Sequence, residues 1–152
     1  MLDVNWARPD RVKSSGVAQT LDMLALDVIR EGYADSKAEA VKYIRQRVPA
    51  ESKYQKDIMK EIKNRAANEH LPCVIWKAAQ GPYSRSGVSD IIALIGGVML
   101  AVEVKRPLFG EASELQRGFV RDVNIAGGVA GFCTYTEDIE PLWELLLGKV
   151  RR

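Results

Sequence analysis

The chain has 152 residues, 47% hydrophobic and 28% charged, which is normal for one globular domain with its own core. Its 22 Lys and Arg nearly balance its 20 Asp and Glu, so a net charge of +2 gives no bulk attraction to nucleic acid. One histidine and two cysteines are too few for a structural zinc module or a disulfide framework. No apolar run reaches membrane-spanning length and the first residues lack a signal peptide, so we expect a protein of the reducing cytoplasm.

The first third of the chain is predicted to be helical. Apolar residues recur with helical spacing from about Val17 to Arg30, and Gly32 fits the end of that helix. Ser36 and Glu39 form a capping-box pattern that begins a second helix, which we expect to end near Arg47. We assign residues 1–48 to an N-terminal helical extension with a role in dimerisation or packing. Its similarity to the helix pair of ribbon-helix-helix DNA-binding proteins is weak, because no convincing ribbon strand precedes it.

The second part of the chain, residues 49–152, is predicted to combine strands and helices. In chain order we expect a helix, a strand, two further strands, a helix, a strand and a helix, at Glu51–Asn68, Cys73–Ala78, Asp90–Ile95, Val98–Lys105, Ala112–Ala126, Val129–Tyr135 and Ile139–Leu147. Gly96 and Gly97 join two apolar runs, which is a strong hairpin signal. This order predicts an α/β fold with a mixed sheet.

The predicted hairpin places two carboxylates opposite each other. If Gly96 and Gly97 form a two-residue turn, Asp90 faces Glu103 directly, with Cβ atoms about 4.5–5.5 Å apart. Lys105 shares the face of Glu103, because side chains alternate along a strand. The rest of the hairpin is apolar on both faces, so we expect both faces to be covered. Opposed carboxylates destabilise a strand pair unless they are compensated, and Mg²⁺ or Mn²⁺ would suit such oxygen ligands.

A purely structural interpretation competes with the metal site. Asp90 could end a strand, and Glu103 and Lys105 could form an ordinary ladder ion pair. An Asp…Glu-x-Lys pattern arises often by chance, so the pattern alone favours the structural interpretation. The opposed register within an apolar hairpin raises the metal-site interpretation to about equal weight.

The residues around this hairpin resemble a known nuclease family. D-I-I-A-L followed by A-V-E-V-K resembles the core of the PD-(D/E)XK nuclease superfamily, in which an Asp starts the second strand and Glu-x-Lys ends the third. VIWKAAQGPYSRSGVSDIIAL, AVEVKRP, the ELQ of the next helix and NIAGGVAGF resemble its VRR-NUC (virus-type replication-repair nuclease) family in particular. The resemblance covers about Glu51 to Trp143 and departs at Ser89, where the superfamily name has Pro. It implies a restriction-endonuclease-like core of the order αβββαβ.

The resemblance also implies a set of site residues for a Mg²⁺-dependent DNA endonuclease. Asp90, Glu103 and the backbone carbonyl of Val104 would bind the metal, and Lys105 would orient the attacking water or stabilise developing charge. Glu51 is the implied helix carboxylate, with Glu61 as its competitor; a charge favoured at a helix start is the structural alternative for Glu51.

Gln116 matches the family's Gln on the helix after Glu-x-Lys, which is expected to point toward the metal. It also completes a capping box with Ser113, and the two interpretations carry nearly equal weight.

The loop before Asp90 is the predicted approach for phosphate and DNA. The predicted DNA-binding residues, including two neighbours outside the loop, are Lys77, Gln80, Gly81, Tyr83, Ser84, Arg85 and Arg106. The glycines allow a close approach of the backbone, although an ordinary connecting loop would have a similar composition.

The resemblance finally suggests a substrate and an assembly. Free-standing members of the family are short, dimeric and similar to Holliday-junction resolvases. We therefore expect a homodimer that cleaves branched DNA in the cytoplasm of a bacterium or of a phage-infected host, without a nucleotide cofactor. The alternatives are a flap, nick or non-specific replication-repair nuclease, and a catalytically idle DNA-binding accessory protein.

Overall fold

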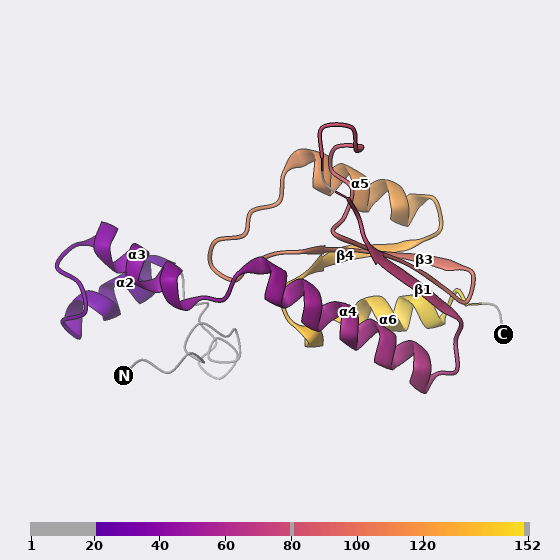
Figure 1. The fold of residues 1–152 in the computed structure, drawn as a ribbon, viewed down its shortest axis with the longest axis horizontal. Helices are drawn as coiled ribbons and strands as arrows, with labels where there is room; N and C mark the ends of the chain where they lie inside the picture. Colours follow the sequence, from indigo (N-terminus) through magenta and orange to yellow (C-terminus); the bar gives the residue numbers. More distant parts are fainter. Residues whose placement is uncertain (1–20, 80, 151–152) are drawn as a thin grey trace. The chain divides into compact units, whose positions relative to one another are not determined.

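A computed structural model describes residues 21–79 and 81–150 (Figure 1). The chain divides into two compact units. The first contains the residues up to Ala50 together with the later segment Arg106–Gly110, and the second contains Glu51–Lys105 and the chain from Glu111 onward. The N-terminal unit thus takes five residues from the middle of the sequence, directly after the predicted Glu-x-Lys strand.

Two helices, α2 (Leu21–Arg30) and α3 (Lys37–Arg47), form the described part of the first unit. Buried apolar side chains of α2 and α3, among them Val28 and Ile44, share a small core. The predicted helix over Val17–Arg30 is described only from Leu21, and its first turn lies outside the described residues. Ser36 Oγ accepts a hydrogen bond from the Glu39 amide at 3.2 Å, as the capping pattern predicts. The Glu39 carboxylate accepts from the amide of Asp35 instead of that of Ser36.

The second unit is an α/β fold with a mixed four-stranded sheet, as the sequence predicts. Its elements are α4 (Glu51–Asn68), β1 (Cys73–Lys77), β2 (Ile91–Ile95), β3 (Val98–Val104), α5 (Glu114–Ile125), β4 (Val129–Cys133), the short 3₁₀ helix η2 (Thr136–Asp138) and α6 (Ile139–Leu147). The strand order is β1-β2-β3-β4. The pairs β1–β2 and β2–β3 are antiparallel, and β3–β4 is parallel.

The β2–β3 hairpin has the predicted register. Gly96 and Gly97 adopt positive φ angles of 53° and 85°, which a two-residue turn of this kind requires. Ile95 faces Val98, and the pairing continues to Ile91 opposite Val102. The next positions along the two strands are Asp90 and Glu103, so the hairpin brings the two carboxylates to one end of the sheet.

Helices cover the two faces of this sheet unequally (Figure 1). Helices α4 and α6 pack on one face, against a core that includes Ile91, Leu100 and Val102. Helix α5 packs on the other face, over Ile92, Ala101 and Ala130, and we call this the α5 face. The prediction that the hairpin is covered on both sides is wrong at Leu94, whose side chain on the α5 face remains 49% exposed. The reason is that α5 packs over the central and β4 side of the sheet and leaves its β1 side open.

Within residues 21–79 and 81–150, no helix combines the length and the apolar character that crossing a membrane would need. Cys133 is buried in the core, and Cys73 is partly buried; neither forms a disulfide.

Candidate active site

Asp90 and Glu103 lie at the open end of the β2–β3 hairpin, away from its turn, and both are buried. Asp90 is 5% exposed and Glu103 1% exposed. The Asp90 backbone carbonyl continues the β1–β2 ladder by accepting from the Ala78 amide at 2.9 Å. The Asp90 carboxylate accepts from the amide of Val104 at 2.8 Å, which ties it to the end of β3. Strand pairing therefore places both residues on the α5 face of the sheet, and the Val104 amide fixes the Asp90 carboxylate there.

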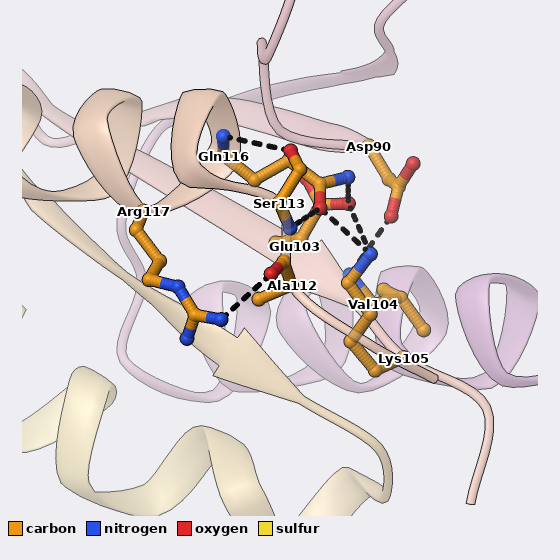
Figure 2. Close-up of polar contacts among 8 residues, drawn as sticks. All are labelled: Asp90, Glu103, Val104, Lys105, Ala112, Ser113, Gln116 and Arg117. Atoms are coloured by element: carbon orange, nitrogen blue, oxygen red, sulfur yellow. Dashed lines mark hydrogen bonds and ion pairs between the residues drawn. The ribbon is translucent and has the colours of Figure 1, made fainter. Parts of the chain in front are cut away.

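Gln116 and Lys105 complete this cluster (Figure 2). The Gln116 side-chain amide donates to Glu103 Oε1 at 2.5 Å, and its carbonyl oxygen accepts from Lys105 Nζ at 3.0 Å. Lys105 Nζ also lies 3.3 Å from Glu103 Oε1. One amide thus orients a carboxylate and an ammonium group together.

The capping box of α5 fixes Gln116 in turn. Ser113 Oγ accepts from the Gln116 amide at 3.2 Å, and the Ser113 amide donates to Gln116 Oε1 at 2.9 Å. The helix-cap interpretation of Gln116 is therefore confirmed, and its side chain also points toward the carboxylate pair; its role in a metal site stays a prediction. The same Oε1 atom caps the helix and binds the lysine.

Burial controls the protonation of Glu103. The pKa of Glu103 is raised to about 7; loss of solvation is the largest cause, the nearby Asp90 carboxylate adds to it, and Lys105 opposes it. A carboxyl group in this condition is half ionised near neutral pH. Any added positive charge at the pair would favour its ionised form.

The donor set of this cluster suits a hard divalent cation. Glu103 Oε2 is buried and has no hydrogen-bond partner among the residues that the structure describes, so one carboxylate oxygen is left for another ligand. Mg²⁺ commonly binds proteins through one or two carboxylates and keeps several waters. No group of three or more His, Cys, Asp and Glu side chains able to hold a metal occurs in the described ranges, so such an ion would rely on the Asp90–Glu103 pair, backbone oxygen and water.

A polar cavity of about 270 Å³ lies beside this cluster, between the loop before Asp90 and the start of α5. Ser84, Arg85 and Ser86 line one side of it, and Ser113 and Gln116 line the other. Gly87 makes the close approach possible. Its φ is 81°, and a Cβ at this position would lie 2.7 Å from the backbone of Leu115.

The structure places the predicted loop residues in different ways. Arg85 lies 5.7 Å from the centre of the Phe119 ring and lines the cavity, whereas Tyr83 is fully exposed. Ser84 Oγ accepts from the Gly81 amide and donates to the Gly81 carbonyl, so these two residues close their own turn. Gln80 lies outside the described residues.

Three other predicted residues are not brought to the carboxylate pair. Lys77 faces Ile91 in the β1–β2 register, which puts its side chain on the face opposite to Asp90. Glu51 begins α4, which packs on that opposite face, and it joins no cluster of carboxylates within the described chain. Its competitor Glu61 binds Arg65 at 2.7 Å.

The prediction that Arg106 binds DNA conflicts with its contacts. Its guanidinium donates to the backbone carbonyls of Arg45, Val48 and Pro49 at the end of α3, all within the first unit. These bonds satisfy carbonyls that a helix end leaves without partners. Arg106 is thus committed to the N-terminal unit, because its side chain stabilises a helix end.

Sequence reasoning missed two groups of this site. The Val104 amide holds Asp90, whereas only the Val104 carbonyl was predicted to take part. Ser89, at the position of the superfamily's Pro, is 1% exposed, and its Oγ has no hydrogen-bond partner within the described part of the chain. The hairpin register could have indicated the Val104 contact, since residues near the end of β3 must lie close to Asp90.

Comparisons of the chain with protein-family models, curated proteins and solved structures gave no significant match. Membership of the VRR-NUC family stays a prediction that rests on the residues quoted above.

Proposed function

We propose that this protein is a metal-dependent DNA endonuclease with a restriction-endonuclease-like core. The observation that carries the proposal is the buried Asp90–Glu103 pair, which has one carboxylate oxygen without a partner and lies beside Lys105. Burial of two neighbouring carboxylates lowers the stability of the fold unless a positive charge compensates them. Such a pair is therefore easier to explain if it binds a cation. A structural ladder pair would more easily lie at the surface, where water solvates both groups.

Mg²⁺, with Mn²⁺ as a substitute, would be held by Asp90, Glu103 and the Val104 carbonyl. When bound, it would lower the pKa of a water ligand and stabilise negative charge on a phosphate. Lys105 contributes a positive charge next to Glu103, where it can orient a nucleophilic water or stabilise charge that develops on the phosphate. Gln116 holds Lys105 and Glu103 at a fixed spacing. Glu51 would join only through water or after movement of α4.

The proposed substrate is branched DNA, such as a four-way junction, cleaved by a homodimer. This part follows from the family resemblance, since two symmetric sites would act on two strands of a junction. The cavity beside Gln116 supports entry of a nucleic-acid backbone, because Arg85 and the hydroxyl groups of Ser84 and Ser86 surround it. A flap, nick or non-specific nuclease remains the alternative substrate assignment.

Cleavage assays on a panel of DNAs test the proposal. Four-way junction, flap, nicked and linear duplex DNAs of matched sequence are incubated with the protein in Mg²⁺ or in EDTA. We expect cleavage only with Mg²⁺, fastest on the junction, and none by Asp90→Asn or Lys105→Ala. Preference for the flap would favour the alternative substrate, whereas full activity of purified Asp90→Asn would refute the mechanism.

A Mn²⁺ titration separates the nuclease from a catalytically idle DNA-binding protein. A nuclease of this kind should show a Mn²⁺ site that disappears in Asp90→Asn, measured by calorimetry at pH 8. Binding that is the same in wild type and Asp90→Asn would favour the accessory protein.

A further inference from the structure

Trp76 is an exposed aromatic side chain on the α5 face of the sheet. It lies on β1, an edge strand, and 47% of its surface is exposed. A half-exposed indole ring offers a flat aromatic surface on which another ring can stack. Its structural contribution is small, because the core on this face is built from Ile92, Ala101, Val123 and Ala130.

The strand register places Trp76 next to the carboxylate pair. Trp76 faces Ile92, and the Ala78 amide donates to the Asp90 carbonyl, so the same ladder extends to Asp90. Trp76 and Asp90 are therefore diagonal neighbours on one face, at about 7–8 Å between backbone positions, within reach of an aromatic side chain. This separation is comparable to the spacing between neighbouring nucleotides in an extended strand.

The surroundings of Trp76 combine apolar surface with positive charge. Leu94 is also exposed on this face, but it lies on the side of Trp76 that points away from Asp90, outside the proposed position of the base. Met99 and Phe119 line an open groove of about 380 Å³ beneath α5, which Arg85 and Asp122 also line. Arg85 also lines the polar cavity beside Gln116, so one cation connects the two hollows. Arg85 is the lining cation that both hollows share, so it can supply a positive charge to a phosphate near Trp76.

We propose that Trp76 stacks on a nucleobase that is unpaired at a branch point next to the scissile phosphate, so that the protein prefers branched DNA to intact duplex. This inference rests on the proposed function, since Asp90 marks where the phosphate would lie. Only an unstacked base can present its face to an exposed indole ring, because bases within a duplex are already stacked on their neighbours. Arg85 would contact the phosphate of the stacked nucleotide.

Binding measured in EDTA tests the inference without requiring cleavage. Fluorescence anisotropy compares labelled single-stranded DNA, duplex with a single-stranded tail, and blunt duplex of the same sequence. Trp76→Ala should weaken binding of the first two by about 5- to 150-fold, the loss expected for one base–aromatic stack. Trp76→Phe should retain most of the affinity, and blunt duplex should change less than about twofold.

Leu94→Ala is the matched control, because it removes exposed apolar surface from the same face without removing a ring. It should leave binding of every DNA unchanged, and the melting temperatures of all variants should stay close to that of the wild type. Equal losses for Trp76→Ala and Leu94→Ala, accompanied by a lower mass in solution, would overturn the proposal in favour of a protein-docking face. Unchanged binding by Trp76→Ala would also overturn it. Stacking without any Mg²⁺-dependent cleavage would refute the proposed function and leave the base site standing.

Discussion

At the scale of single residues, Glu103 shows how a candidate site conflicts with stability. Its carboxyl group is almost completely removed from water and lies near Asp90, so burial raises its pKa to about 7. The ordinary value is 4.5. The folded state therefore prefers the protonated group. Its stabilising contribution is complete below about pH 4.5, the value in the unfolded chain, and is lost as the pH rises through about 7.

Because the folded state favours protonated Glu103, replacing this residue with Gln should stabilise the protein at high pH when no metal is bound. The variant keeps an acceptor for Gln116 and removes the titrating group, so it should be more stable than the wild type at pH 8, by on the order of 3 kcal/mol. The difference should shrink as the pH falls toward 5. Thermal melts in EDTA between pH 5 and 8 measure it. A difference in melting temperature that does not change with pH would contradict the assigned pKa of Glu103.

The residues of the site were predictable from sequence to different degrees. Asp90, Glu103 and Lys105 followed from a hairpin register, because a two-residue Gly-Gly turn fixes every opposed pair. Lys77 and Arg106 were predicted from their places near the motif in the sequence. Lys77 lies on the face of the sheet opposite to Asp90, and Arg106 binds backbone carbonyls at the end of α3. These contacts depend on the tertiary fold, so the local sequence pattern did not indicate them.

At the scale of elements, the N-terminus of α5 joins helix formation to the geometry of the site. Ser113 caps the helix, and the residue that completes the capping box, Gln116, holds Glu103 and Lys105. Correct formation of the first turn of α5 therefore sets the spacing between a carboxylate and an ammonium group. Gly87 permits the preceding loop to approach this turn, where any side chain would meet the Leu115 backbone.

Ser113→Ala should affect both stability and the site. Loss of the cap should cost about 1 kcal/mol of folding free energy, measured by urea unfolding. If the proposed function holds, the rate of cleavage at saturating DNA should fall, because Gln116 no longer holds Lys105 and Glu103 at a fixed spacing. Ser113→Thr retains a capping hydroxyl and should restore both properties. A fall in stability with an unchanged cleavage rate would show that the cap is structural only.

Most helices and strands were predicted because their apolar periods are clear. Helix α4 at Glu51–Asn68 and helix α6 at Ile139–Leu147 have the predicted bounds, whereas β1 and β4 are shorter than predicted at their C-terminal ends. The 3₁₀ helix η2 was not predicted, since three residues contain too little periodicity to indicate it. The incomplete cover of the α5 face also escaped prediction, because it depends on where one helix packs across four strands.

At the scale of the whole molecule, the chain forms two units, and the first unit includes a short segment from the later part of the sequence. The segment Arg106–Gly110 follows Lys105 directly but belongs to the N-terminal unit. Within that unit Phe109 lies beneath the guanidinium of Arg45, at 4.3 Å from the ring centre. The boundary predicted from the sequence falls just after the end of α3. It could not show that Arg106–Gly110, much later in the chain, also belongs to the first unit.

Arg106→Ala should therefore loosen the N-terminal unit. It removes the charged hydrogen bonds to three backbone carbonyls, of which two are part-buried and one is exposed. Hydrogen exchange should show faster exchange in α3, while exchange in β2 and β3 stays near the wild-type rate. Arg121→Ala, which removes an exposed ion pair with Asp122, is the control and should change neither. Unchanged protection of α3 would contradict the role given to Arg106.

The cleavage rate of a synthetic four-way junction tests the central claim most directly. It is measured under single-turnover conditions, with Mg²⁺ and with EDTA, for wild type, Glu103→Gln and Glu144→Gln. Glu144 is an exposed carboxylate on α6, which covers the opposite face of the sheet, so its variant controls for loss of one charge. We predict Mg²⁺-dependent cleavage by the wild type and Glu144→Gln, and at least about a hundredfold slower cleavage by Glu103→Gln. Equal rates for Glu103→Gln and Glu144→Gln, or no cleavage of any branched DNA by the wild type, would contradict the account.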